Sequence, residues 1–182
     1  METKTMGKVL CTARIENLND LFNAEQGILP EDQVRRVEVT DALVDTGASG
    51  LLLPSRLIAA LGLKPLRVRQ ARGIGGPLTV SIYGTVRLTI QGRDCPMDVG
   101  EISDDLPVIV GQIPLESLDW VVDLKGQRLI GNPEHGGEHI MEVYALTADE
   151  QLAFWIALNA PADVTDAQRR LGSIMRGEGL TL

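Results

Sequence analysis

Short runs of apolar residues, separated by glycine and proline, recur along the first two-thirds of the chain. Alternation of apolar and polar positions predicts strands, because successive side chains of a strand point to opposite faces. Glycine-bearing turns between the runs favour hairpins over long helices. The predicted strands cover residues 8–16, 34–44, 51–54, 68–72, 78–83, 86–90, 97–102, 107–111, 120–124 and 128–130.

Short helices are predicted where a capping residue precedes apolar residues at helical spacing. Asn17 caps the first, over residues 17–26, and Ser55 caps the second, over residues 55–61. A further short helix is expected with Pro114 in its first position, where the missing N–H of proline costs nothing.

The pattern changes beyond Pro133, where a polar stretch with two glycines is followed by two amphipathic runs. Each run begins with a capping box, at residues 147–150 and 165–168, so two short helices are expected. The sequence therefore predicts a domain over residues 1–133, a linker over 134–146 and a helical extension over 147–182.

Composition and charge narrow the class of protein. Of 182 residues, 44% are hydrophobic and 23% charged, which excludes a disordered chain. Lys and Arg number 17 against 25 Asp and Glu, and aromatic residues make up only 3%. A phosphate backbone needs clustered cations and base stacking needs aromatic side chains, so no nucleic-acid partner is expected.

Neither a membrane nor a secretory pathway is expected. No apolar run approaches the roughly 18 residues that span a bilayer. The first eight residues lack the apolar stretch of a signal peptide. Cys11 and Cys95 are too few for a disulfide framework, so two buried thiols in a cytoplasmic protein are the expectation.

Asp45 is the residue that suggests chemistry. It directly follows a predicted buried strand and begins the turn of small residues Asp45-Thr-Gly-Ala-Ser49. Burial disfavours an ionised carboxylate unless donors meet it, and Thr46 and the amides of Gly47 and Ala48 are the nearest donors. An Asp held in this way can act as a general base. Asp-Thr-Gly also occurs in ordinary β-turns, so the tripeptide alone does not identify a site.

The context of this turn resembles the retropepsin-like aspartic proteases, the family of the retroviral proteases and their single-domain bacterial relatives. The resemblance extends from about Lys8 to Pro133. Residues 43–49 resemble the catalytic loop, residues 73–76 the glycine-rich flap tip, and residues 108–111 the hydrophobic-hydrophobic-Gly element that crosses behind that loop. The order of the three pieces makes the resemblance more specific than any one of them.

The resemblance implies a mainly β, closed-barrel acid protease fold with short helices and the C-terminal helical extension. It also implies hydrolysis of peptide bonds in a peptide or protein substrate, with no cofactor and no metal. The implied site residues are Asp45 as the catalytic carboxylate, Thr46, Gly47 and Ala48 as supports of the catalytic loop, and Gly73, Ile74, Gly75 and Gly76 as the flap.

A homodimer follows from the same resemblance. Asp-Thr-Gly occurs once in the chain, so each chain carries half of a two-carboxylate site. Two copies of Asp45 would share one proton at a two-fold axis, one acting as base and the other as acid. The alternative is a non-catalytic dimeric peptide-binding or scaffolding module on the same fold.

Three weaker signals leave alternatives open. His135-Gly-Gly-Glu-His139 matches a zinc string that works only on a helix, and its glycines oppose a helix. Three arginines precede the flap. They either form a solvated face of a strand or contact an acidic peptide substrate. Gln112-Ile-Pro114 departs from the viral pattern, which puts the packing of the nearby loop in question. The three arginines are Arg67, Arg69 and Arg72.

Overall fold

Strands dominate the part of the chain that the structure, a computed structural model, describes: residues 8–73 and 75–140. Ile74 and the predicted extension over 147–182 lie outside the described residues. The strands are β1 (Val9–Asn17), β2 (Arg36–Val44), β3 (Leu51–Pro54), β4 (Pro65–Gly73), β5 (Gly76–Ile90), β6 (Arg93–Ile102), β7 (Ile109–Val110), β8 (Trp120–Asp123) and β9 (Arg128–Gly131).

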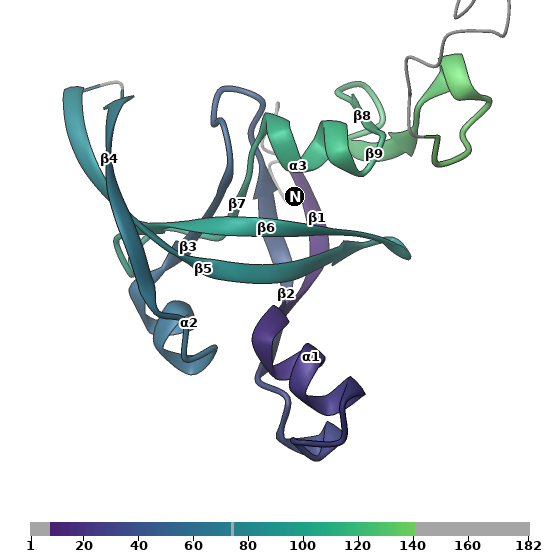
Figure 1. Cartoon of the computed structure of the whole chain (residues 1–182). Helices are drawn as coiled ribbons and strands as arrows, with labels where there is room; N and C mark the ends of the chain where they lie inside the picture. Colours follow the sequence, from purple (N-terminus) through teal and green to yellow (C-terminus); the bar gives the residue numbers. More distant parts are fainter. Residues whose placement is uncertain (1–7, 74, 141–182) are drawn as a thin grey trace, which may run out of the picture. The chain divides into compact units, whose positions relative to one another are not determined.

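One curved sheet contains the first seven of these strands, in the order β1-β2-β7-β3-β6-β5-β4 (Figure 1). β1 also pairs with β5, so the sheet is ring-like and β4 lies at its edge, beyond β5. β8 and β9 form a separate antiparallel hairpin. The predicted mainly β fold is therefore confirmed.

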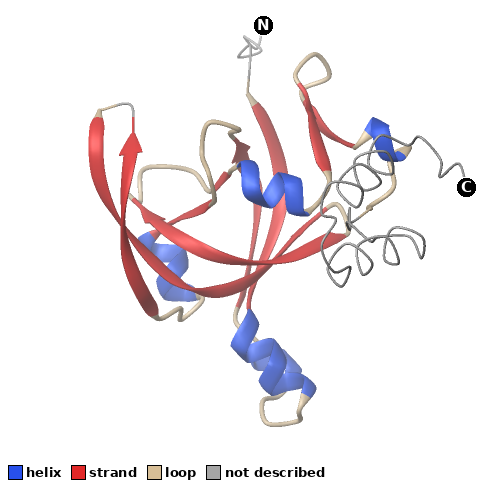
Figure 2. Cartoon of the chain, turned by 45° about the horizontal axis from the view of Figure 1, so that its top comes forward, coloured by secondary structure: helices blue, strands red, loops and turns tan. Residues whose placement is uncertain are grey.

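In the described chain, three short α-helices come after strands (Figure 2). The first two follow directly on β1 and β3, and Gly111 separates the third from β7. Asn17 caps α1 (Leu18–Glu25) as predicted, since its side chain accepts hydrogen bonds from the amides of Asn19 and Asp20 at 3.0 and 3.2 Å. α2 (Ser55–Ala60) lacks the predicted Ser55 cap. Ser55 is instead the first residue of the helix, preceded by Pro54, and its hydroxyl donates to Glu101 Oε1 at 2.7 Å.

The two faces of the sheet have different roles. On the core face, one row of paired residues crosses six strands and is buried except at its last member. On the outer face, the adjacent row is mostly half-buried or exposed. The core row is Val9, Val44, Val110, Leu51, Val99 and Tyr83, and the outer row is Leu10, Leu43, Ile109, Leu52, Gly100, Ile82 and Arg67.

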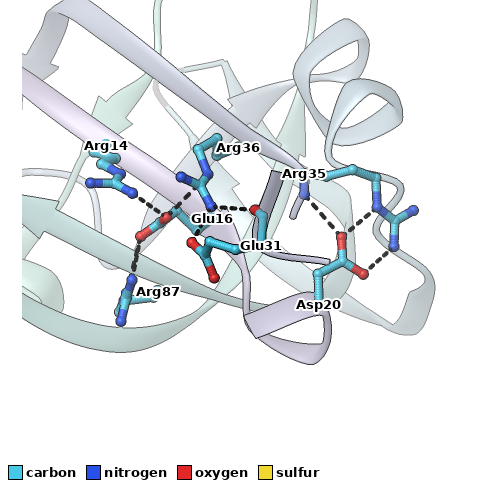
Figure 3. Close-up of polar contacts among 7 residues, drawn as sticks. All are labelled: Arg14, Glu16, Asp20, Glu31, Arg35, Arg36 and Arg87. Atoms are coloured by element: carbon cyan, nitrogen blue, oxygen red, sulfur yellow. Dashed lines mark hydrogen bonds and ion pairs between the residues drawn. The ribbon is translucent and has the colours of Figure 1, made fainter. Parts of the chain in front are cut away.

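Glu16, near the end of β1, is a buried carboxylate among three arginines (Figure 3). Arg14 Nη2 lies 2.7 Å from its Oε1, and Arg87 Nη2 lies 2.7 Å from its Oε2. Arg36 Nε lies 3.4 Å from Oε1. Burial raises the pKa of Glu16, but the hydrogen bonds and charges of Arg87 and Arg14 hold it below its usual value. The cluster joins β1, β2 and β5 where the ring-like sheet meets itself.

A second ion pair fixes α1 to the segment before β2 (Figure 3). Arg35 Nε and Nη2 donate to the two carboxylate oxygens of Asp20 at 2.6 and 2.7 Å, a bidentate geometry. The Arg35 amide adds a third bond to Asp20 Oδ2 at 3.1 Å. The hydrogen bond from the Arg35 guanidinium is the main cause of a lowered pKa of Asp20.

Asp119, between α3 (Gln112–Ser117) and β8, binds the chain that follows β9. Its carboxylate lies 2.7 Å from His135 Nδ1 and accepts bonds from Asn132 Nδ2 at 2.9 Å and the Ile140 amide at 3.3 Å. The hydrogen bond with His135 is the main cause that lowers the pKa of Asp119 to about 2. The first residues of the predicted linker are thus bonded to the sheet domain.

We predict that Glu16→Gln lowers the free energy of unfolding by about 1–3 kcal/mol, because two arginines lose charge-assisted hydrogen bonds to a buried group. Urea denaturation measures this change. Glu31→Gln is the matched control: it removes an exposed carboxylate that also bonds Arg36, so its effect should stay below about 0.5 kcal/mol. Equal effects of the two variants would contradict the assigned role of Glu16.

Candidate active site

Residues 45–50 form the loop that joins β2 to β3, and β7 lies between these two strands. β7 is parallel to β2 and antiparallel to β3. The Leu43 amide donates to the Val108 carbonyl at 2.8 Å, and the Asp45 amide donates to the Val110 carbonyl at 3.0 Å. The start of the loop is therefore fixed by a strand that reaches it from some 60 residues further along the chain.

Asp45 is the first residue after β2, and its side chain is exposed. The Gly47 amide donates to Asp45 Oδ1 at 2.9 Å, as the sequence predicted. The Ala48 amide donates instead to the main-chain carbonyl of Asp45 at 3.0 Å. In the described chain the Thr46 side chain makes no hydrogen bond to this carboxylate. A Cβ on Gly47 would lie 3.1 Å from Asp45 Oδ1, so glycine leaves room for the bond.

Three successive amides hold the loop from behind. Gly111 donates to the Gly50 carbonyl at 3.0 Å, Gln112 to that of Ala48 at 2.8 Å, and Ile113 to that of Ser49 at 3.0 Å. The first amides of a helix have no partner within the helix, so those at the start of α3 are available for these bonds. The main chain of residues 111–113 thus supports the loop without using a side chain.

Gly111 is required by this contact. A Cβ at this position would lie 2.5 Å from the Ala48 carbonyl oxygen and 2.6 Å from that of Gly50, both main-chain atoms. The resemblance identified Gly111, but no sequence pattern indicated that the Gln112 and Ile113 amides take part. Because main-chain groups make the contact, the departure of Gln112-Ile-Pro114 from the viral pattern leaves it intact.

Pro114 lies at the third position of α3, not at the first as predicted. Gly111 precedes the helix, which begins at Gln112. Proline is accommodated at this position because an N–H there would have no carbonyl partner within the helix. It follows directly after the three donating amides, so none of them is lost.

The outer face of the sheet continues beside Asp45. Val44 points into the core, so by alternation Leu43 and Asp45 point to the other side. Leu43 pairs with Ile109, and Ile109 pairs with Leu52. These three apolar side chains are half-buried in the described chain, and they place an apolar surface next to the carboxylate.

The predicted flap is the tip of the hairpin made by β4 and β5. Gly73 is the Cα partner of Gly76, and Gly75 lies in the turn between them. Ile74, the fourth predicted flap residue, lies outside the described residues. β4 is nearly all exposed, and the hairpin rises on the same side of the sheet as the 45–50 loop (Figures 1 and 2).

The three pieces of the resemblance thus correspond in the structure to a loop with an exposed Asp, a strand that contacts this loop, and a projecting hairpin. Residues 33–113 match the model of a protein family described as Aspartyl protease. The matching family is one of the retropepsin-like clan of aspartyl proteases. A search of curated proteins found no match.

The aspartyl protease segment extends from the residues before β2 into α3. It contains the loop of Asp45, the whole β4–β5 hairpin and Gly111. It leaves out β1, with Glu16, and the β8–β9 hairpin. All predicted site residues thus fall within the segment that matches the family.

The zinc alternative finds no support in the geometry. Pro133–His135 is a single 3₁₀ turn, and Gly136 and Gly137 have φ of 65° and 86°, so residues 135–139 do not form the helix that the motif needs. In residues 8–73 and 75–140, no three His, Cys, Asp or Glu side chains are grouped to hold a metal ion.

None of the helices in these ranges is long and apolar enough to cross a membrane.

We predict that Gly111→Ala disrupts the aspartyl protease loop, because the new Cβ overlaps two main-chain oxygens that cannot both move aside. The melting temperature should fall by several degrees, as expected for a change costing about 2 kcal/mol or more in a chain of this size. Gly50→Ala is the matched control, since a Cβ there meets no atom within 4 Å. A stable Gly111→Ala protein would show that the amide contacts are not rigid.

Proposed function

We propose that this protein is an aspartic endopeptidase whose active site is formed by the Asp45 carboxylates of two identical chains. The observation that carries the proposal is Asp45 itself: an exposed carboxylate at the end of a buried strand, in a segment of the aspartyl protease family. Family membership supports protease activity in general, and the role of Asp45 and the dimer are the proposed details.

Two carboxylates are needed because amide hydrolysis requires both a base and an acid. One Asp takes a proton from water as the water attacks the carbonyl carbon, and the other donates the shared proton to the carbonyl oxygen. The proton taken from water then passes to the leaving nitrogen as the C–N bond breaks, and the second Asp regains its proton from the hydroxyl group as the new carboxyl group forms. At a separation of about 3 Å the pair shares one proton, since both cannot be ionised together. Asp-Thr-Gly occurs once in the sequence, so a second chain must supply the partner.

The surroundings of Asp45 support this assembly. Among the described residues, the Gly47 amide alone donates to its carboxylate, which leaves the other oxygen available to a second carboxylate or a water. Asp45, Thr46 and Gly47 are exposed in the single chain, as a surface that meets its own copy must be. Ala48 and Ser49 are held by the α3 amides, so the carboxylate stands on a rigid support.

The substrate would lie across the outer face, between the loop and the hairpin. Leu43, Ile109 and Leu52 present apolar side chains there, and Ile82 continues the surface toward the hairpin. Burying apolar side chains of a peptide on this face would contribute most of the binding free energy. We therefore propose that the peptides cleaved have apolar residues next to the scissile bond.

We also propose a cytoplasmic location. Cys11 and Cys95 are free and buried, and burial is the main cause that raises the pKa of each thiol to about 11. Both thiols therefore stay protonated and unpaired, which suits a reducing compartment.

We predict that Asp45→Asn lowers peptide cleavage at least a hundredfold, because the amide can neither accept nor donate the transferred proton. Cleavage of a peptide library between pH 4 and 7, followed by mass spectrometry, measures the loss. Asp41→Asn, which removes an exposed carboxylate four residues earlier on β2, is the matched control and should cleave like the parent.

Equal cleavage by the parent and Asp45→Asn would refute the assignment of Asp45. If the parent binds peptides of the library but cleaves none at any pH, the fold serves as a dimeric peptide-binding module instead. Thermal melting separates these results from simple unfolding. The Asn variant should be as stable as the parent or more so, because the repulsion between two carboxylates is gone.

We predict a homodimer at micromolar concentration, measurable by sedimentation velocity across a dilution series. Activity per chain should fall on dilution together with the fraction of dimer, because the monomer holds half of the site. A preparation that is active and inhibited by a statine-type transition-state mimic, yet sediments as a monomer at every concentration, would contradict the shared site.

A further inference from the structure

Three arginines lie on β4, the outer strand of the hairpin, in a chain whose net charge is -8. β4 and β5 pair in regular antiparallel register from Arg67 to Gly73, so alternate residues of β4 face opposite sides of the hairpin. This register assigns each of the three guanidinium groups to one side of the hairpin, an assignment that could not be made from the sequence. The arginines are Arg67, Arg69 and Arg72.

Arg72 lies on the reverse side of the hairpin. The Gln70 side chain donates to Thr79 Oγ1 at 3.2 Å, which places these paired residues on one common side. Arg72 is two residues beyond Gln70 and shares that side. Arg67 and Arg69 therefore lie on the opposite side, the one that continues the outer face of the sheet.

Arg67 already has a partner. Its Nη2 lies 2.6 Å from Asp98 Oδ2, and the other oxygen of Asp98 accepts a hydrogen bond from the Thr85 hydroxyl at 3.1 Å. The charge of Arg67 is thus offset within the chain, and its guanidinium is held on the sheet.

Arg69 has no ion pair or hydrogen bond to its side chain within the described residues, and it is exposed. Its partner on β5 is Val80. Val80 Cγ1 and Leu52 Cδ2 both come within 3.3 Å of where a Cβ on Gly100 would stand, so Val80 and Leu52 meet on the outer face. Arg69 therefore borders the same apolar surface that reaches the loop of Asp45.

Two other carboxylates of β6 are engaged within the described chain. Asp98 binds Arg67, and Glu101 belongs to the core face, where it accepts bonds from Ser55 and from Tyr83 at 3.1 Å. An unpaired guanidinium beside an apolar surface binds a carboxylate in its fixed fork geometry.

We propose that Arg69 selects an acidic side chain of the substrate, Asp or Glu, on the flank of the apolar residues at the scissile bond. This inference rests on the proposed protease function and adds a charge requirement to it. Arg69 acts here as a specificity-determining residue, and it takes no part in the proton transfers.

The test uses the 182-residue protein and has two steps. Cleavage of a synthetic peptide library, read by mass spectrometry, first identifies a peptide with Glu or Asp near the scissile bond. That peptide and its counterpart with Gln or Asn at the same position are then compared by kcat/KM for the parent, Arg69→Gln, Arg69→Lys and Arg72→Gln. Arg72→Gln is the matched control, because it removes one cation from the same strand on the reverse side.

The parent should prefer the acidic peptide by about fivefold, the advantage of one partly exposed ion pair. Arg69→Gln should abolish this preference mainly through KM, Arg69→Lys should restore part of it, and Arg72→Gln should retain it. The preference should also shrink at high ionic strength.

Different failures have different meanings. If the parent cleaves peptides with equal kcat/KM for the acidic and amide forms, or if Arg69→Gln keeps the preference, the Arg69 inference is wrong and the protease function stands. If Arg69→Gln shifts the sedimentation coefficient instead, Arg69 binds the second subunit and the inference is again wrong. If the parent cleaves nothing between pH 4 and 7, the proposed protease function is wrong, and so is the inference on Arg69 that rests on it.

Discussion

The geometry of this domain depends on three amides that donate to three carbonyls. Residues 111–113 bind the main chain of residues 48–50, and this contact fixes the loop of Asp45 to a segment far along the chain. The glycine at position 111 allows the close approach, and the unpaired amides of a helix start provide the donors. Because main-chain atoms make the contact, side chains at 112 and 113 can differ between relatives without moving the loop.

The two faces of the sheet have different environments, and neighbouring residues of one strand belong to opposite faces. On one face Val44, Val110 and Leu51 pack in the core, and on the other Leu43, Ile109 and Leu52 stay partly open beside Asp45. The same three strands therefore provide stability and a binding surface at once. Elsewhere in the sheet, where β1 pairs with β5, the ion pairs of Glu16 with Arg14 and Arg87 connect these two strands.

Alternation and turn residues predicted nearly all the strands, the Asn17 cap and the loop after β2, because these features depend on local sequence. Contacts between distant residues were not predictable. Nothing near Glu16 indicated that Arg87, 71 positions away, would bind it. Ser55 was predicted to cap α2, but its hydroxyl binds Glu101, 46 positions away. The three arginines of β4 could not be told apart before the pairing register assigned each to a side.

The position of β4 at the end of the sheet order has a further consequence. Within the described chain no strand pairs with its outer edge, which lies next to the exposed Leu66 and Val68. Such an edge can pair with strands of other chains and so promote aggregation. Arg69 and Arg72 place positive charge on both sides of this strand, and charges of like sign on two such edges oppose their pairing. Arg69 and Arg72 thus also oppose aggregation, and a chain without them would carry, at the edge of its sheet, an apolar strand whose remaining charge on Arg67 is paired with Asp98.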